Sequence, residues 1–367
     1  MFELDEPYVG KEELNYLKQA IDSGWISAMG PFVKKFEDKF AEYIGVKYAV
    51  SCASGTSAIS LLCPTLQIKP GDEVILQSLT FTADAWAMHQ AGAKIIFADC
   101  AKNTFSIDPD DVRKKISNKT KIISPTHLYG RPSRMDDLRE ICDQNNIYLI
   151  EDCCQAMGSR YKDKMVGSMG DFNFYSFHNK LIASGEGGMI TTNDKNLAER
   201  FDKLKNPPAV NRPEERDGFT EISMNHRLSN LHAAVGLAQL ERLEQNIEKK
   251  LRMAEIYDEI FENAEGINLI KEDNKNRTVW WRYTILLDPR INVNKFKQEA
   301  LGNKIVVREG YLPLHKHPFF KEHNNLHLPN AERLGNEAID IPSSFKLKED
   351  EIVLIGQTLK KIAKNLL

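Results

Sequence analysis

The sequence predicts an α/β fold in which a large domain with a mostly parallel sheet precedes a smaller α+β domain. Two observations support this prediction. From about 47 to 205, short apolar runs alternate with amphipathic stretches, as in parallel strands joined by right-handed crossovers. From about 250 onward the pattern changes to strands and helices in mixed order. We therefore predict a large domain over 1–245 and a small C-terminal domain over 246–367.

The elements of both domains can be placed along the chain from periodicity and from capping residues. Helices are predicted at Gly10–Ser23, Pro31–Tyr43, Asp108–Ile116, Asp194–Lys205, Leu231–Phe261, Val293–Leu301 and Lys348–Leu366. Strand-like runs lie at Tyr48–Cys52, Glu73–Leu76, Lys94–Asp99, Lys121–Pro125, Tyr148–Ile150, Phe172–Phe177, Met189–Thr192, Val279–Leu287, Lys304–Val307 and Ala338–Pro342. The stretch Asn206–Thr220 contains three prolines and many charges, which predicts an exposed loop.

Composition excludes several classes of partner. The net charge is −3 and the Lys and Arg residues are scattered, so we expect no nucleic-acid partner. The six cysteines lack metal-ligand spacing and are interpreted as reduced thiols of a cytoplasmic protein. The acidic N-terminus lacks the apolar core of a signal peptide, and no run has the length of a membrane span. We therefore expect neither a metal site nor a membrane partner.

One stretch, from Tyr148 to Asp194, concentrates residues that could carry chemistry. Its first apolar run ends on Glu151 and Asp152, and ligands of open α/β sheets bind at the carboxyl ends of strands. Lys180 follows in an apolar context, five residues before the Gly-rich turn at Gly185. A lone lysine is usually a surface residue, but a desolvated one has a lowered pKa and can form a Schiff base. Pyridoxal phosphate (PLP) needs such an amine and an acid facing its ring nitrogen.

A second stretch could hold a phosphate. Small residues from Ser54 through Gly55 and Thr56 open an apolar helix, and a helix N-terminus presents N–H groups to an anion. Alone, this pattern would be an ordinary Ser/Thr cap. Together with Lys180, a phosphate cradle at Gly55 and Thr56 is the better interpretation. Phe81 and His127, by contrast, could be an ordinary core aromatic and a polar core histidine.

The order of Asp152, Ser176, Lys180 and Gly185–Gly188 resembles the DegT/DnrJ/EryC family of sugar aminotransferases over nearly the whole chain, closest to its perosamine-forming members. The resemblance implies a fold type I PLP-dependent transferase with pyridoxal 5'-phosphate as cofactor and pyridoxamine 5'-phosphate as its intermediate form. It implies transfer of an amino group from glutamate to the 4-keto carbon of a nucleotide-linked 4-keto-6-deoxyhexose, in deoxyamino-sugar biosynthesis for O-antigen lipopolysaccharide. It also implies a homodimer with shared active sites.

Carried over position by position, the resemblance makes Lys180 the Schiff-base lysine and Asp152 the partner of the ring nitrogen. Further residues implied to bind the cofactor are Gly55, Thr56, Phe81, Gln155, Ser176 and, from the other subunit, Asn225. Residues implied to face the substrate are Trp25, Met29, Gly30, Arg227, Tyr311 and His315. Asn225 could equally be a capping or loop asparagine, and Arg227 a structural ion pair.

Two details depart from a simple match. Only His178 and Asn179 separate Phe177 from Lys180, one residue fewer than is common in the family. Either the loop is tightened or Ser176 is displaced from the phosphate, and His178 has no assigned role. His315 and His317 alternate on a predicted strand, but no third ligand accompanies them, so a metal site is not expected.

Several functions therefore remain open. A UDP- or dTDP-linked 4-keto-6-deoxyglucose, or a 3-keto sugar, could be the substrate instead. A PLP-dependent sugar dehydratase is the alternative in another chemical class, since relatives of that kind replace the lysine with histidine. A relative without catalytic activity is the third possibility, and a lysine-bound cofactor would argue against it.

Overall fold

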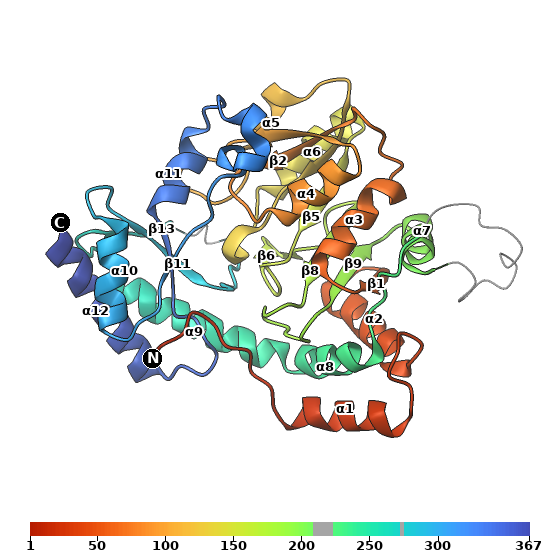
Figure 1. Ribbon diagram of the computed structural model, residues 1–367, viewed down its shortest axis with the longest axis horizontal. Helices are drawn as coiled ribbons and strands as arrows, with labels where there is room; N and C mark the ends of the chain where they lie inside the picture. Colours follow the sequence, from red (N-terminus) through yellow and green to blue (C-terminus); the bar gives the residue numbers. More distant parts are fainter. Residues whose placement is uncertain (208–222, 272–274) are drawn as a thin grey trace, which may run out of the picture.

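The computed structural model describes residues 1–207, 223–271 and 275–367, and it contains two main sheets (Figure 1). Most of the predicted loop Asn206–Thr220 lies outside the described residues. The larger sheet has seven strands in the order β1-β9-β8-β5-β4-β2-β3. These strands are β1 (Tyr48–Cys52), β2 (Glu73–Gln77), β3 (Lys94–Ala98), β4 (Thr120–Ser124), β5 (Tyr148–Asp152), β8 (Phe172–Ser176) and β9 (Gly188–Thr192).

Six of these strands run in one direction and β9 runs against them. β2 pairs in parallel with β3 and β4, and β5 pairs in parallel with β4 and β8. β9 is antiparallel to both β1 and β8. The prediction of an α/β fold with a mostly parallel sheet is therefore confirmed. A two-residue hairpin that the sequence analysis did not identify, β6 (Arg160–Tyr161) with β7 (Lys164–Met165), follows β5.

Helices cover this sheet, and local residue chemistry sets their ends. In α2 (Pro31–Ile44), Pro31 occupies the first turn, and Gly45 ends the helix in the left-handed conformation with φ 81°. The other helices of this region are α1 (Lys11–Asp22), α3 (Gly55–Thr65), α4 (Ala83–Gln90), α5 (Pro109–Lys115), α6 (Met135–Asn145) and α7 (Lys195–Lys205), with a 3₁₀ turn η1 (Leu128–Gly130).

The single long helix predicted from Leu231 to Phe261 is wrong in one respect. The structure has two helices, α8 (Asn230–Glu241) and α9 (Leu243–Phe261), which meet at Arg242. Their apolar periodicity runs through the junction, so the pattern does not reveal the break. Arg242 lies at the junction and forms an ion pair with the buried Glu13 of α1 (2.5 Å). In Figure 1 the two helices run one after the other along one side of the molecule.

The C-terminal part forms a second, antiparallel sheet in the order β10-β11-β13-β12. Its elements are β10 (Ile267–Asn268), β11 (Tyr283–Leu287), α10 (Val293–Gly302), β12 (Arg308–Glu309), η3 (Leu314–Lys316), η4 (Pro318–His323), α11 (Pro329–Glu337), β13 (Ala338–Ile341) and α12 (Glu349–Leu366). Three sequence predictions are corrected here. The strand predicted from Val279 begins only at Tyr283. The strand after α10 is Arg308–Glu309 rather than Lys304–Val307, where Ile305 forms an isolated bridge. His315 lies in a 3₁₀ turn instead of a strand.

The first residues of the chain pack against this second sheet. Phe2 forms a bridge with Ile305, and Ser343 N donates to the Leu4 carbonyl (2.7 Å). Both termini accordingly lie at the same end of the molecule, near α12 (Figure 1). A domain boundary near 245 remains a prediction, since α9 contacts α12 and the N-terminal residues join the C-terminal part. In the described ranges, no helix combines the length and apolarity needed to cross a bilayer.

Candidate active site

The carboxyl ends of the parallel strands meet at one edge of the large sheet, and the predicted chemistry gathers there. β5 ends on Asp152, β8 ends on Ser176, and the end of β1 leads into α3 at Gly55. β9 begins at this edge, where Gly188 pairs with both Cys52 and Ser176. The apolar strand interiors are buried, so the polar groups at this edge are the ones available to a ligand.

The first turn of α3 forms a cradle that only a glycine permits. Ser54 caps the helix by accepting from Ser57 N (3.0 Å). A Cβ on Gly55 would come within 2.8 Å of Ser176 Cβ and 3.4 Å of Cys154 Sγ, so Ser176 lies directly beside this turn. Thr56, on the same turn, is exposed. The shortened segment before Lys180 is accommodated by Asn179, which takes the left-handed conformation (φ 48°), and Ser176 stays next to Gly55.

Lys180 lies against an aromatic ring. Its Nζ is 3.1 Å from the centre of the Trp281 ring, and Trp281 is held by donating from Nε1 to the Asn179 carbonyl (3.0 Å). Burial lowers the pKa of Lys180 from 10.5 to about 8, and the charge of Asp152 opposes part of that lowering. A sizeable fraction of the amine is therefore neutral near neutral pH, roughly a tenth at pH 7, which suits a nucleophile and proton carrier.

The two acids at the end of β5 have different surroundings. Glu151 is fully buried and accepts from Gly167 N (2.9 Å), Met169 N and Gly170 N (both 2.7 Å), and from His127. Glu151 therefore anchors the chain after β7. Asp152 accepts from Cys154 N (2.9 Å) through Oδ1 and is 4% exposed at the strand end. Of the pair, Asp152 is the acid that can face a cofactor.

His127 has a structural position. Its Nδ1 accepts from Ser133 N (2.9 Å), which leaves Nε2 to donate to Glu151 (3.0 Å). The side chain thus ties the end of β4 to the end of β5. His127, Glu151 and Cys153 offer ligand atoms within 4.8 Å of one another, but His127 and Glu151 already use these atoms in hydrogen bonds.

Three further predicted residues join the cluster. Phe81 is 52% exposed, unlike a core aromatic, and its ring centre is 6.3 Å from that of Tyr311. Gln155 donates through Nε2 to the Tyr311 hydroxyl (3.1 Å) and accepts from Tyr129 N (3.0 Å). Burial raises the pKa of Tyr311 to about 12, so its phenol stays protonated. An exposed aromatic beside fixed amide and phenol groups is suited to hold a planar ring.

The remaining predicted residues form a second group. Asn225 is exposed and accepts from Arg227 Nε (3.0 Å). Arg227, Met29 and Gly30 line one hollow of about 250 Å³ together with Lys205. The carbonyl of Trp25 accepts from Asn230 Nδ2 at the start of α8 (2.5 Å). Within the described ranges, no hydrogen bond joins Asn225 or Arg227 to Lys180 or Asp152.

His315 is placed differently from the other residues predicted to face a substrate. It is fully buried, with Nδ1 bonded to Ser78 Oγ (2.6 Å) and Nε2 to Glu332 Oε1 (3.1 Å). Both ring nitrogens are therefore engaged, and the ring links α11 to the loop after β2. This arrangement supports a structural role for His315.

Residues that the sequence analysis did not single out complete the cluster. Trp281 supplies the ring under Lys180, Cys154 lies between Gly55 and Asp152, and Asp84 of α4 is buried within reach of Asp152. The sequence around Lys180 does not point to Trp281, because Trp281 lies about a hundred residues further along the chain. A lowered lysine pKa implies a desolvating neighbour without identifying it. Asp84 carries a signal that could have been used, namely a carboxylate in a helix whose other residues are apolar as far as Met88.

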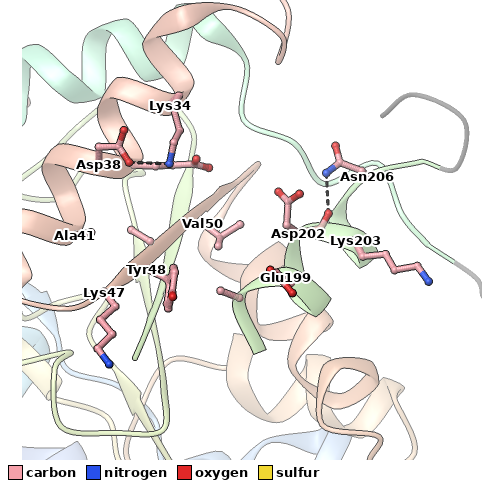
Figure 2. Close-up of a pocket in the computed structure, with 13 residues that line it drawn as sticks. Lys34, Asp38, Ala41, Lys47, Tyr48, Val50, Glu199, Asp202, Lys203 and Asn206 are labelled. Carbon is pink, nitrogen blue, oxygen red and sulfur yellow. Dashed lines mark hydrogen bonds and ion pairs between the residues drawn. The ribbon is translucent and has the colours of Figure 1, made fainter. Parts of the chain in front are cut away.

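A hollow away from this edge differs from the Lys180 cluster because its polar groups are already paired with one another. About 500 Å³ of space lies between α2, α7 and β1 (Figure 2). Its polar groups bond to one another, as Lys34 does to Asp38 (2.7 Å) and Asn206 to the Asp202 carbonyl (2.7 Å). It shares no residue with the Lys180 cluster, and we assign it no ligand.

The cluster fits PLP. The glycine-only first turn of α3 with Ser176 beside it suits a phosphate, and Phe81 offers an exposed ring for stacking. Lys180 supplies an amine of lowered pKa, and Asp152 supplies a carboxylate for a protonated ring nitrogen.

Comparisons with known proteins agree with this geometry. Residues 7–360 match the model of the DegT/DnrJ/EryC1/StrS aminotransferase family. The chain is 36% identical to GDP-perosamine synthase of Escherichia coli O157:H7 over 97% of both chains. It is 32% identical to dTDP-3-amino-3,6-dideoxy-alpha-D-galactopyranose transaminase of Aneurinibacillus thermoaerophilus, over 96% of this chain and 95% of that one. The structure of S. venezuelae DesV with a ketimine intermediate superposes with a TM-score of 0.90 at 28% identity, covering 96% of this chain and 94% of that one.

The family match covers nearly the whole chain, and the relatives act on nucleotide-linked sugars. The fold type I assignment and the PLP cofactor predicted from the sequence are confirmed. The chain belongs to the DegT/DnrJ/EryC1/StrS aminotransferase family and is a PLP-dependent nucleotide-sugar aminotransferase.

Proposed function

We propose that this enzyme moves an amino group from glutamate to the 4-keto carbon of a GDP-linked 4-keto-6-deoxyhexose, as a GDP-perosamine synthase does. The observation that carries the proposal is the full-length similarity to GDP-perosamine synthases of several bacteria, at 34–36% identity. A relative named for a dTDP sugar matches at 32% identity, so a dTDP- or UDP-linked sugar is the alternative that an assay must separate.

Bound PLP would accept the amino group from the donor and pass it to the sugar, with its protonated ring withdrawing electrons from the carbon that loses a proton. Lys180 is proposed as the residue that first holds the cofactor and then carries the proton between the substrate carbon and the cofactor. The pKa of about 8 suits this role, because the amine can both give and take a proton near neutral pH.

The other residues of the cluster bind and orient. Asp152 would face the ring nitrogen and keep it protonated, since a close carboxylate favours a cation. Gly55, Thr56 and Ser176 would hold the phosphate at the first turn of α3. Phe81 would stack on the ring and exclude water, while Gln155 and Tyr311, bonded to each other, would border it.

A homodimer with shared sites completes the proposal. Asn225 lies on an exposed segment with no hydrogen bond to the Lys180 cluster of its own chain within the described residues. Around the same region Trp25, Ile26 and Met29 are all more than half exposed, and such apolar exposure favours a contact with a second copy. In a twofold dimer, Asn225 would reach the cofactor phosphate of the partner subunit, and Trp25, Met29, Gly30 and Arg227 would border the partner's substrate.

Subunit mixing tests the dimer. Lys180→Ala and Asn225→Ala homodimers should both be poorly active. A mixture should regain up to about a quarter of the parent activity, because half of the dimers are hybrids and each has one intact site. Each variant mixed with itself is the control. An active species that stays monomeric in light scattering would refute the shared site.

The substrate is tested by direct competition. The holoenzyme is given ¹⁵N-glutamate and, in equal amounts, GDP-4-keto-6-deoxymannose, dTDP-4-keto-6-deoxyglucose and UDP-4-keto-6-deoxyglucose. We expect ¹⁵N at C4 of the GDP sugar, with 2-oxoglutarate formed in equal amount. Preferential labelling of the dTDP or UDP sugar, or labelling at C3, would replace the proposed substrate. A deoxygenated sugar without nitrogen would indicate the dehydratase instead.

A further inference from the structure

A second carboxyl group is buried directly behind the proposed partner of the cofactor ring. Asp84, in the first turn of α4, is 2% exposed and lies within hydrogen-bonding reach of the Asp152 carboxyl. The Thr126 hydroxyl also reaches Asp84, and it accepts in turn from Thr80 Oγ1 (3.0 Å). Asp84 thus joins α4 to the ends of β4 and β5.

The surroundings of Asp84 do not suit an anion. Its Oδ2 is fully buried and receives no donor from the described residues, among which the Thr126 hydroxyl alone reaches this carboxyl as a donor. A buried carboxylate normally receives such donors, as Glu151 does from three backbone N–H groups. A carboxylic acid at this position instead has a proton to donate, and the Asp152 carboxyl is an acceptor within its reach.

Two adjacent buried carboxyls cannot both ionise, so one proton is shared between them. Burial first, and then the charge of Asp152, raise the pKa of Asp84 well above its usual range. Asp152 differs from Asp84 in its contacts, because it accepts from the backbone N–H of Cys154 and lies close to the Lys180 amine. The start of α4 favours negative charge on Asp84, but this effect is smaller than the penalty of burial beside a like charge. The geometry therefore leaves the proton on Asp84 and the charge on Asp152.

We propose that Asp84 is a positioning residue: a neutral carboxylic acid whose O–H donates to Asp152 and holds that carboxylate toward the cofactor ring nitrogen. This inference rests on the proposed role of Asp152. It gives Asp84, the buried acid of α4, a part in setting the protonation of the cofactor ring. The proposed function does not otherwise require Asp84.

Two substitutions of Asp84 test whether its side chain is a neutral hydrogen-bond donor or an anion. Asp84→Asn retains a neutral N–H donor of nearly the same shape, whereas Asp84→Ala removes the donor. We expect Asp84→Ala to lower kcat by about 10- to 100-fold, the loss typical of a hydrogen bond to a charged group, with KM for glutamate little changed. Asp84→Asn should recover most of this loss. Ser124→Ala is the matched control and should behave as the parent, because it removes from neighbouring β4 a buried hydroxyl that has no hydrogen-bond partner among the described residues.

Two readouts do not depend on turnover. In the infrared spectrum of the apoenzyme at neutral pH, the parent should show a buried carboxylic-acid C=O band that Asp84→Asn lacks. In the holoenzyme with ¹⁵N-labelled PLP, the ring nitrogen resonance should move toward the unprotonated position in Asp84→Ala and stay near the parent in Asp84→Asn. Circular dichroism and melting temperature identify a variant that has failed to fold, in which case Asp84→Asn and the infrared band alone decide.

The outcomes distinguish the two proposals. If Asp84→Asn loses a carboxylate band instead of a carboxylic-acid band, Asp84 is not a neutral donor. Equal losses of kcat in folded Asp84→Ala and Asp84→Asn would overturn the proposal as well. A ring nitrogen signal unaffected by Asp152→Asn overturns the role of Asp152 itself, whatever Asp84 does. A change of sugar substrate in the competition assay leaves the inference intact, because the infrared band is measured without substrate.

Discussion

Lys180 and Lys250 are both largely removed from water and both contact Trp281, yet only one is suited to chemistry. Lys250 donates to the Trp281 carbonyl (2.9 Å) and to the Ser343 carbonyl, and its ammonium lies 4.7 Å from the centre of the Phe345 ring. Lys180 has the face of Trp281 and, within the described residues, no hydrogen-bond acceptor. Burial lowers the pKa of Lys250 to about 7 and that of Lys180 to about 8. The lower pKa thus belongs to the lysine without a proposed role.

The difference teaches that a depressed pKa is insufficient evidence for a reactive amine. The nitrogen of Lys250 donates to two fixed carbonyls, so its N–H protons are committed to structure. The nitrogen of Lys180 donates to no acceptor of the described residues, and it lies close enough to Asp152 for that charge to act on its pKa. Proximity to the Asp152 carboxylate and the lack of fixed acceptors among the described residues distinguish Lys180 from Lys250, and desolvation does not.

The largest effect expected from this comparison is on turnover. Lys180→Ala should lower kcat by about 10²- to 10⁴-fold or more, because it removes both the anchoring amine and the proton carrier. The variant should still bind PLP noncovalently, without the absorbance of the lysine-bound form. Lys250→Met is the matched control and should keep turnover of the same order as the parent. Comparable losses in the two variants, with both folded, would show that the comparison is mistaken.

The next effect tests the carboxylate near Lys180. Asp152→Asn should lower kcat roughly 10- to 100-fold, the cost of one hydrogen bond to a charged group, and should change the melting temperature little. The ring nitrogen would lose the charge that keeps it protonated. The measurement is steady-state kinetics with thermal unfolding of the same samples. A variant that unfolds early but turns over normally when folded would assign Asp152 to structure.

Most residues of the candidate site could be proposed from the sequence because short-range signals mark strand ends. The apolar run before Asp152, the small residues at Gly55 and the Gly-rich turn after Lys180 each reveal an element end, and a parallel sheet brings such ends together. Contacts between distant segments leave no such signal. Trp281 under Lys180, His315 buried against Ser78 and the break at Arg242 depend on tertiary packing, which periodicity does not encode.

A third prediction concerns stability and pH. The pKa of Lys250 falls from 10.5 to about 7 on folding, so between those pH values the unfolded chain binds more protons than the folded one. Stability must therefore rise with pH across this window, at up to about 1.4 kcal/mol per pH unit. Lys250→Met lacks this contribution. In denaturant titrations of the apoenzyme, the stability of the parent relative to Lys250→Met should grow from pH 7 to pH 10. A constant difference would mean that Lys250 is not desolvated in solution.

The smallest effect tests the ring beneath Lys180. A protonated amine over an indole face is stabilised by about 0.5–2 kcal/mol, and a phenyl ring does this less well. Trp281→Phe keeps an aromatic face but weakens that attraction and removes the indole N–H bond to Asn179. Because the ring favours the charged form, its weakening should lower the pKa of Lys180 further, by less than about one unit. Trinitrophenylation of the apoenzyme followed across pH 6–10, with Lys180 identified by peptide mapping, measures the shift. Asp152 opposes the burial effect at the same amine, so Asp152→Asn should shift this pKa in the same direction. An unchanged pKa in Trp281→Phe would show that desolvation sets the pKa of Lys180 and that the ring contributes only packing.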